Sequence, residues 1–384
     1  MIKELIDFFK KVDSHNFYSK MVEGNYSINQ ISNLIIKHPD KPIRELLTLN
    51  KLQKQVAGRI KKSERFIFTA KGVEQASSTV LAEYHAEKMQ EYDYIADLCC
   101  GNGIDLYYTS FGKKQVWAVD LDEDTLLAAE YNNKGNEHIT YLQQRAEEFA
   151  EPVDAIFIDP DRRSGNRRLI QAEDLSPGLS EILKLQTITA NILVKLSPAM
   201  NYKDITLKVK HSWEFISENG ELKEILLCLG DFAQPVNRAV LLPAKNIFSA
   251  NKQEVEVRPI QLFLLEPDVA IIRAGLVQDL GFECAATLIE SHLALLSHPN
   301  EIYSEYFKTY RVLDQMNFNR KNLQKYLREK QIGKLVIKTR GFSQSVEEFR
   351  KKLKLSGENS GLIFILRMGK GHQIVFAELM NLRK

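Results

Sequence analysis

The stretch Asp93-Tyr-Ile-Ala-Asp97-Leu-Cys-Cys-Gly101-Asn-Gly103-Ile-Asp105 has the pattern of a short apolar strand that ends in a carboxylate, followed by a glycine turn and the start of a helix. Glycine lets the backbone approach a ligand closely because it has no Cβ. A second apolar segment, residues 116–119, ends at Asp120. An acidic residue about twenty positions after such a turn can bind the hydroxyls of a ribose. The spacing therefore predicts a site for a cofactor that contains a nucleoside.

The residues around the turn indicate which cofactor this is. The dinucleotide fingerprint requires a third glycine where this chain has Leu106, so a pyrophosphate is not favoured. The pattern Asp-x-x-x-Gly-x-Gly instead resembles the first motif of class I S-adenosylmethionine-dependent methyltransferases. A further apolar segment, residues 153–158, ends in Asp159-Pro160-Asp161, which resembles the Asp/Asn-Pro-Pro turn beside the methyl group in nucleic-acid methyltransferases. Two glycines alone would indicate an ordinary turn, but the three strand ends together predict S-adenosyl-L-methionine.

Length and composition set the outer limits of this prediction. The 384 residues suffice for two or three domains. No run of about eighteen apolar residues occurs, and the N-terminus lacks the apolar core of a signal peptide, so we expect no membrane segment. The cysteines lack the spacing of zinc ligands, and we expect no metal site and a reducing, cytoplasmic location; they are Cys99, Cys100, Cys228 and Cys284.

Charge is distributed unevenly along the chain. The net charge is only +2, yet residues 308–354 contain 14 Lys/Arg against 4 Asp/Glu. Residues 51–71 are also basic, with Glu64 as their only acidic residue. Such asymmetry predicts an anionic polymer as a partner, and we expect RNA to bind through residues 308–354. The alternative is a solvated helix face with no ligand.

The order of the predicted elements indicates an α/β protein. Residues 1–90 have helical periodicity. From 91 to 250 strands and helices alternate, and Asn219-Gly220 then marks a tight turn between two apolar segments. This pattern predicts a Rossmann-like doubly wound sheet with an antiparallel terminal hairpin, which is the class I methyltransferase fold. The expected parallel strands are residues 93–98, 115–120, 138–142, 153–158 and 191–196.

The residues after 250 are expected to form small α+β domains. A strand is predicted at 258–265, and residues 266–297 are predicted to be mostly helical. A second strand is predicted at 334–338, a helix at 345–353 and a hairpin over 361–379.

The chain also resembles a known family, the bacterial S-adenosylmethionine-dependent methyltransferase-like proteins with a C-terminal THUMP-like domain. The resemblance covers nearly the whole chain. It implies a linker α/β domain of the ferredoxin-like kind at 251–310 and a THUMP-like domain at 311–384. It also implies a link to RNA, because THUMP domains act in RNA modification. The motifs that carry it are Val73–Ser78, Ala96–Asp105, Asp159–Arg163, Glu266–Gly275 and Lys338–Gly341.

The resemblance implies roles for the strand-end residues. Asp97 would orient the glycine loop and the methionine end of the cofactor, although capping of the next helix is the simpler role. Asp120 would accept hydrogen bonds from the ribose, since a carboxylate is a good bidentate acceptor. Arg145 stands where the family often has an Asp that reaches adenine, so the backbone of Ala146 or the side chain of Glu147 would take that role. The expected cofactor-binding residues are Asp97, Cys99, Gly101, Gly103, Asp120, Leu121, Ala146, Glu147 and Asp159.

The segment Asp159-Pro160-Asp161-Arg162-Arg163 is the predicted catalytic turn. Enzymes that methylate exocyclic amino groups usually have an aromatic residue after Pro-Pro, and this chain has none. The turn resembles the Asp-Pro-Pro-Arg of pyrimidine carbon-5 methyltransferases, but those need a cysteine nucleophile, and residues 193–198 contain none. The two arginines would bind a phosphate or stack on a base; the alternative is surface pairing with Asp161 or Glu173. Lys195, at the end of a predicted strand, is expected to face the same site.

These observations predict a methyltransferase that acts on a base nitrogen of RNA. The alternative from another class is a non-catalytic RNA-binding protein that retains the fold, because Cys99, Arg145 and Asp161 depart from the family pattern. A small-molecule methyltransferase is a third possibility, and the basic C-terminal region argues against it.

Overall fold

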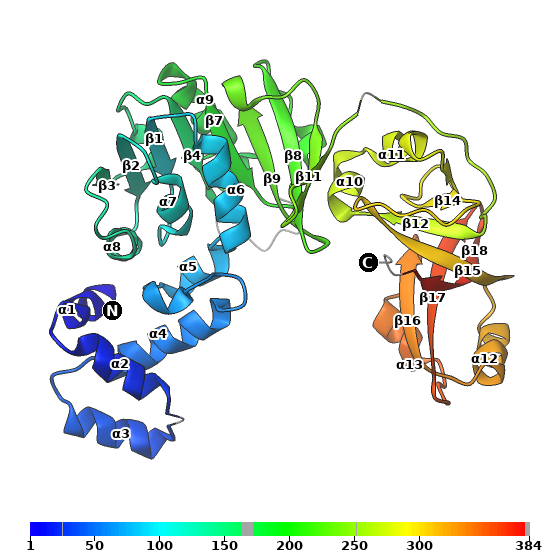
Figure 1. Cartoon of the computed structure of the whole chain (residues 1–384), viewed down its shortest axis with the longest axis horizontal. Coiled ribbons are helices and arrows are strands. Elements are labelled where there is room, and N and C mark those ends of the chain that lie inside the picture. Colours follow the sequence, from blue (N-terminus) through cyan, green and yellow to red (C-terminus); the bar gives the residue numbers. More distant parts are fainter. Residues whose placement is uncertain (25, 163–171, 251, 381–384) are drawn as a thin grey trace. The chain divides into compact units, whose positions relative to one another are not determined.

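The computed structural model of the protein describes residues 1–24, 26–162, 172–250 and 252–380 (Figure 1). Two compact units make up the chain. The first consists of residues 1–213 with 224–235, and the second of residues 214–223 with 236–384.

A large sheet of order β11-β10-β8-β9-β7-β4-β1-β2-β3 forms the core. The pairs β7–β4, β4–β1, β1–β2 and β2–β3 are parallel, and β9 pairs antiparallel with β7. All of β4 is buried, as expected of a parallel strand covered on both faces. The strands are β1 (Tyr94–Leu98), β2 (Gln115–Asp120), β3 (Ile139–Gln143), β4 (Ala155–Ile158), β7 (Ile192–Leu196), β8 (His211–Glu218), β9 (Glu221–Leu229), β10 (Arg238–Leu242) and β11 (Asn246–Phe248).

This topology confirms the predicted fold class. Helices α7 (Ile104–Thr109), α8 (Glu123–Asn132) and α9 (Leu179–Lys184) follow β1, β2 and β6 (Leu175–Ser176) along the chain. The β8–β9 turn has Asn219 and Gly220 at positive φ, +53° and +80°, which is the backbone that a tight hairpin turn requires. The antiparallel hairpin after five parallel strands therefore has the place that the sequence predicts.

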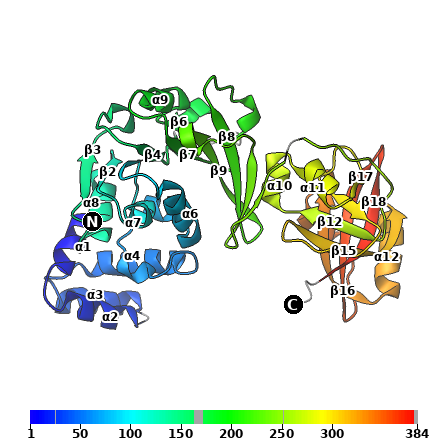
Figure 2. The same ribbon diagram turned by 45° about the horizontal axis from the view of Figure 1, so that its top comes forward.

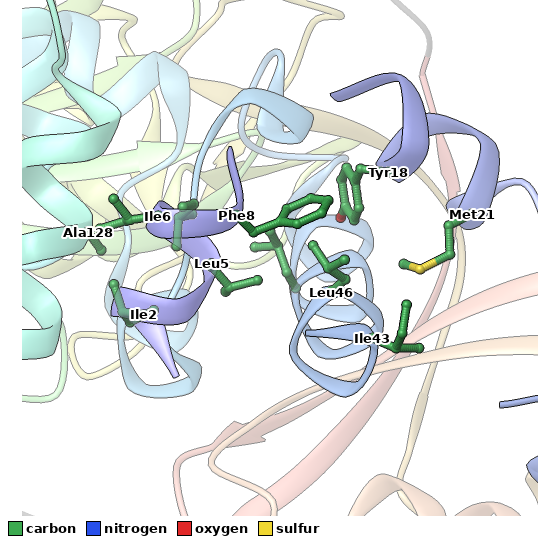
Figure 3. Close-up of a cluster of buried hydrophobic side chains, with 11 residues drawn as sticks. Ile2, Leu5, Ile6, Phe8, Tyr18, Met21, Ile43, Leu46 and Ala128 are labelled. Atoms are coloured by element: carbon green, nitrogen blue, oxygen red, sulfur yellow. The ribbon is translucent and has the colours of Figure 1, made fainter. Parts of the chain in front are cut away.

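The N-terminal helices belong to the first unit and pack against its helix α8. They are α1 (Ile2–Phe9), α2 (Ser14–Val22), α3 (Ile28–Lys37) and α4 (Ile43–Val56). Their apolar stripes meet in one buried cluster, which includes Leu5, Phe8 and Leu46 and also reaches Ala128 of α8 (Figure 3). Helix α1 lies beside α8 in both views of the ribbon (Figures 1 and 2).

The segment that follows α4 is hydrogen-bonded to the glycine loop. It contains α5 (Ala70–Gln75) and leads into α6 (Thr79–Met89). The backbone N–H of Ile67 donates to Asn132 Oδ1 over 2.7 Å, and Asn132 Nδ2 donates to the carbonyl of Asn102 over 2.8 Å. The backbone N–H of Thr69 donates to Asn102 Oδ1 over 3.2 Å. Residues before 90 therefore contact the predicted cofactor loop. The domain boundary predicted at residue 90 stays a prediction.

The second unit contains a seven-stranded sheet of order β13-β14-β12-β15-β18-β17-β16. Apolar residues alternate along its strands, so that Ile363 and Ile365 of β17 belong to one buried cluster and Phe364 and Leu366 to another. Its strands are β12 (Phe263–Pro267), β13 (Thr287–Leu288), β14 (Leu296–His298), β15 (Phe307–Asn317), β16 (Ile332–Arg340), β17 (Asn359–Met368) and β18 (Gly371–Leu379). The predicted boundary at 310 falls within β15, and the division into two C-terminal domains stays a prediction.

Two predictions for this unit are wrong. The strand predicted at 258–265 begins only at Phe263, the first residue of β12. Residues 266–297 are not mostly helical, since only α10 (Val269–Ala274) and α11 (Val277–Glu283) form there before β13 and β14 begin. Gly275, with φ +77°, ends α10 after six residues. Leu295 and Leu296 then join the buried side chains of the sheet. Short apolar runs of this kind do not distinguish helix from strand by periodicity.

Candidate active site

The predicted cofactor residues meet at one edge of the large sheet. Strands β4, β1 and β2 are adjacent and parallel, so their carboxyl ends lie together. Asp97 lies in β1, Asp120 ends β2, and Asp159 follows β4 directly. The structure thus brings together three carboxylates that are far apart in the sequence.

The glycine loop is held by the carboxylate at the end of β2. The backbone N–H of Gly101 donates to Asp120 Oδ2 over 3.0 Å, and the N–H of Asp122 donates to Oδ1 over 3.0 Å. Burial raises the pKa of Asp120, and these two hydrogen bonds oppose that shift. Because a carboxylate has about four acceptor sites, Asp120 retains capacity for two further donors.

The two glycines of the loop have different roles. Both have positive φ, +57° at Gly101 and +72° at Gly103. A Cβ on Gly103 would lie 2.6 Å from Asn133 Nδ2 and 3.1 Å from the Ala129 backbone, so this glycine allows the loop to pack on α8. A Cβ on Gly101 would meet no protein atom within 4 Å among the described residues. The Cα of Gly101 therefore faces open space.

Asp97 is a buried carboxylate for which the described residues provide no hydrogen-bond partner. Its side chain is 1% exposed, and within the described residues neither oxygen accepts a hydrogen bond. Burial raises the pKa of Asp97 well above its ordinary value, and the carboxylates of Asp105 and Asp159 raise it further. An unpaired buried carboxylate is costly. A ligand with a cationic N–H group at this position would supply the missing donors.

The remaining predicted cofactor residues differ in how far they are exposed. Leu121 is 60% exposed directly after β2. Cys99 has positive φ, +59°, and burial raises the pKa of its thiol. Ala146 is buried in a short 3-10 turn after β3, where Arg145 Nε donates to Glu147 Oε1 over 2.5 Å. The departure at Arg145 is thus accompanied by an ion pair that occupies Glu147.

The predicted catalytic turn is divided between two sets of partners. Asp159 Oδ2 accepts a hydrogen bond from Lys195 Nζ over 2.7 Å. Asp161 instead forms an ion pair with Lys71, and its Oδ1 accepts from Gln75 Nε2 over 2.6 Å. Pro160 between them is buried. Asp161 belongs to β5 (Asp161–Arg162), which pairs with β6, whereas Arg163 lies outside the described residues.

A chain of buried polar contacts leads inward from Asp159. Lys195 Nζ also donates to Ser77 Oγ over 3.0 Å, and Ser77 Oγ donates to Asp105 Oδ2 over 2.8 Å. His85 then lies between two carboxylates, with Nδ1 2.7 Å from Asp105 Oδ1 and Nε2 2.6 Å from Glu224 Oε1. These contacts join the carboxyl edge of the sheet to α6, α7 and β9.

The charged side chains in this series of buried contacts alternate in sign. Burial alone would lower the pKa of His85, but Glu224 and Asp105 raise it from 6.5 to about 10. Burial would raise the pKa of Asp105, but the His85 cation lowers it from 3.8 to about 2. Burial would likewise lower the pKa of Lys195, and the carboxylates of Asp159, Asp105 and Glu224 outweigh it and raise the pKa. We conclude that His85 and Lys195 are both cationic at neutral pH.

Sequence reasoning missed several members of this site. Lys195 has the contact with the site that its strand-end position predicts. His85 gave no signal, because a lone histidine within a helix has the same pattern as a core residue. Ser77 lies inside a family motif, Val73–Ser78, and Lys71 lies just before it, so the motif could have drawn attention to both.

Comparison with known proteins agrees with this fold. Residues 307–378 match the family described as THUMP domain-like. Two curated proteins of Mycobacterium tuberculosis, from strains CDC 1551 / Oshkosh and H37Rv, are each described as an uncharacterized S-adenosylmethionine-dependent methyltransferase. Each is 26% identical over 320 residues, which cover 80% of this chain and 86% of the relative.

A solved structure shows the same architecture. The crystal structure of a protein from Porphyromonas gingivalis W83, proposed to be a methyltransferase, aligns with a TM-score of 0.73 and 19% identity. The alignment covers 94% of this chain and 93% of the chain from Porphyromonas gingivalis. The chain is therefore a class I methyltransferase-fold protein with a C-terminal THUMP-like domain, as its sequence predicts.

Two other findings concern metals and membranes. Among the described residues, no group of three or more His, Cys, Asp or Glu side chains is arranged to hold a metal ion. No helix in the same part of the chain is long and apolar enough to span a bilayer.

The buried histidine generates a prediction about stability. A pKa raised above its unfolded value means that the His85 charge stabilises the fold fully below pH 6.5 and progressively less as pH rises toward about 10. The free energy of unfolding, measured by urea titration from pH 6.5 to 10, should therefore fall more steeply for the wild type than for His85→Gln. His15→Gln, at an exposed histidine, is the control and should follow the wild type. Parallel curves for wild type and His85→Gln would contradict the assignment of a buried imidazolium.

Proposed function

We propose that the protein is an S-adenosylmethionine-dependent methyltransferase that methylates a base nitrogen in RNA. The observation that carries the proposal is the unpartnered carboxylate of Asp97, which lies next to an open glycine loop and the paired Asp159. A cofactor with a cationic amino group, a ribose and a reactive methyl group fits these features.

The residues at the sheet edge suit this cofactor one by one. Asp97 would accept the methionine ammonium, which would satisfy its buried oxygens. Asp120 would use its remaining acceptor sites for the ribose hydroxyls. The open side of Gly101 would admit the cofactor close to the backbone. Leu121 and the Ala146 backbone would contact the adenine. Similarity to the two curated relatives supports the same cofactor.

Asp159 is the residue proposed to act on the substrate. When bound, the cofactor would supply an electrophilic methyl group. Its C–S bond would break with the electrons left on sulfur, the new N–C bond would form, and the methylated nitrogen would release one proton to solvent. The protein's task is alignment, since this chemistry needs little covalent help. Asp159 would accept a hydrogen bond from the N–H of the target base and so aim the nitrogen lone pair. Arg162 and Arg163 are proposed to bind the substrate.

The RNA partner is proposed from the surface of the THUMP-like domain. Helices α12 (Arg320–Glu329) and α13 (Val346–Lys351) bury apolar side chains in one cluster with β16, and so lie on the same face of the sheet. Gln324 of α12 exchanges two hydrogen bonds with the backbone of Lys354, at 2.6 and 2.8 Å. The exposed cations of this surface, which we call the α12–α13 surface, are Arg320, Lys321, Lys325, Arg328, Lys330, Lys351, Lys352 and Lys354.

Two cations of the basic stretch, Lys338 and Arg340, bind the same largely buried carboxylate. Glu266 Oε2 accepts from Lys338 Nζ over 2.5 Å, and Oε1 accepts from an Arg340 nitrogen over 2.8 Å. Tyr310 donates to the same carboxylate over 2.8 Å. Lys338 and Arg340 are therefore excluded from the proposed RNA surface, although their charges contributed to its prediction.

The first prediction concerns the cofactor. Asp120→Ala should weaken binding of S-adenosylmethionine by about 1.5–3 kcal/mol, because it removes charge-assisted hydrogen bonds to the ribose. Isothermal titration calorimetry measures this, with Asp124→Ala at an exposed position of α8 as the matched control. The proposal fails if the wild type shows no binding at millimolar cofactor.

The second prediction concerns the reaction. Transfer of labelled methyl groups to undermodified total RNA should be lost by Asp159→Ala and retained in part by Asp159→Asn, which keeps an oxygen acceptor for the target N–H. Wild-type turnover by Asp159→Ala would contradict the catalytic role. Binding of both ligands by the wild type without any transfer would instead favour the alternative, an RNA-binding protein that retains the fold.

The third prediction concerns RNA binding. Reversal of four charges on the α12–α13 surface, Lys325→Glu, Arg328→Glu, Lys351→Glu and Lys352→Glu together, should weaken binding to many RNAs alike. It should also flatten the plot of log affinity against log salt, because fewer counterions are released. The matched control reverses four exposed lysines of the N-terminal region, Lys3, Lys10, Lys11 and Lys20. Equal slopes for the two variants would indicate a solvated helix face.

A further inference from the structure

The position of Lys195 gives it a role beyond filling the site. Its Nζ donates to Asp159 Oδ2 at 2.7 Å and to Ser77 Oγ at 3.0 Å, and its side chain is 13% exposed. Oδ1 of Asp159 accepts no hydrogen bond from any described residue, and the carboxylate is 29% exposed. One oxygen is therefore held by the protein while the other remains available to a substrate.

We propose that Lys195 is a positioning residue that keeps Asp159 an ionised, acceptor-only carboxylate, so that the reacting nitrogen of the substrate must be one that carries a hydrogen. This inference rests on the proposed function, since it concerns which nitrogen the same site accepts. The substrate class is then the exocyclic amino groups and ring N–H groups of bases. Ring nitrogens without hydrogen lie outside it.

The direction of each hydrogen bond in the buried chain supports this role. A carboxylate can only accept, so the single proton of the Ser77 hydroxyl is donated to Asp105. Ser77 must then accept from Lys195, which requires a donor at Nζ. Both ring nitrogens of His85 face carboxylates, so both must donate, and the ring is an imidazolium. With the carboxylates ionised, each hydrogen bond in this series runs from Lys195, Ser77 or His85 to a carboxylate or to Ser77.

The charges around Asp159 support the same conclusion. The acidic side chains near Asp159 are Asp97 in β1, Asp105 in α7 and Glu224 in β9, and the cations are Lys195 in β7 and His85 in α6. Burial raises the pKa of Asp159, and Lys195 is the first opposing influence. Without its ammonium group, Asp159 would have a buried site and like-charged neighbours that both favour the protonated acid.

Ionisation of Asp159 determines what it recognises. When Asp159 is ionised, its Oδ1 can accept a hydrogen bond from an N–H of the substrate. A carbonyl oxygen or a hydrogen-free ring nitrogen at the same place would be a second acceptor, and no hydrogen bond could form. A site built to bind an N–H can reject an analogue without it by a factor of about 10⁴ or more. A protonated Asp159 would donate instead, and this discrimination would be lost.

The test separates the ionisation of Asp159 from the activity of the enzyme. Infrared difference spectra between acid and neutral pH report the carbonyl stretch of protonated carboxyls, and the band lost in Asp159→Asn identifies Asp159. In Lys195→Met this titration should move to higher pH by about one unit or more, because an opposite charge is removed. Lys195→Arg should preserve the wild-type titration, and Lys203→Met, at an exposed lysine, should leave it unchanged.

Methyl transfer provides the second readout. In single-turnover assays on undermodified RNA, the acid limb of the rate profile should shift upward in Lys195→Met by the same amount as the infrared titration, and Lys195→Arg should restore it. Mass spectrometry of the nucleosides should find the methyl group on a nitrogen that carried hydrogen. An unmoved infrared titration in folded Lys195→Met, or a product methylated on a hydrogen-free ring nitrogen, would overturn the inference.

Failure of the proposed function would look different. A wild type that transfers no methyl to RNA would refute the methyltransferase assignment. The infrared titration would still decide whether Lys195 holds Asp159 ionised, because it requires neither cofactor nor RNA.

Discussion

The ion pair between Asp159 and Lys195 is the contact on which the arrangement of the site depends. Charges with little solvent exposure need partners, and removal of one partner from a buried pair typically costs about 3–5 kcal/mol. Here the requirement extends from the pair through Ser77 and Asp105 to His85 and Glu224. These contacts connect Asp159, which follows β4, to side chains of β7, α7, α6 and β9.

The segment before the first strand has a direct part in the site. Ser77 accepts from Lys195, and Lys71 and Gln75 of α5 bind Asp161. A Cβ on Gly72 would lie 1.7 Å from Asn102 Oδ1, which shows how closely α5 approaches the glycine loop. The helical N-terminal region is therefore part of the site, because it supplies partners to Asp161 and to Lys195, the residue that binds Asp159.

The sequence predicted the fold class and the edge of the sheet that holds the site, for a clear physical reason. Strand ends, glycines and the Asn219-Gly220 turn are local signals that the backbone obeys wherever they occur. The predicted strands 93–98, 115–120 and 191–196 correspond to β1, β2 and β7, and each predicted end lies within one residue of the observed end. The helical prediction for 266–297 failed because packing of Leu295 and Leu296 into a sheet outweighed local preference.

The chemistry behind Asp159 could not be predicted in the same way. Ser77, His85 and Glu224 belong to three separate segments, and only the folded topology makes them neighbours. The charge count of residues 308–354 also overstated the exposed surface, since Lys338 and Arg340 bind Glu266. Counts in sequence do not distinguish a solvated cation from one with an internal partner.

The central claim is that the edge formed by β4, β1 and β2 binds S-adenosylmethionine with its methyl group facing Asp159. A crystal structure with S-adenosylhomocysteine, which lacks the methyl group and does not react, tests it most directly. We expect the amino group of the ligand within hydrogen-bond distance of Asp97, its ribose hydroxyls on Asp120 and its sulfur on the side of Asp159. A ligand bound elsewhere, or one at this edge that leaves both oxygens of Asp97 without a partner, would contradict the account.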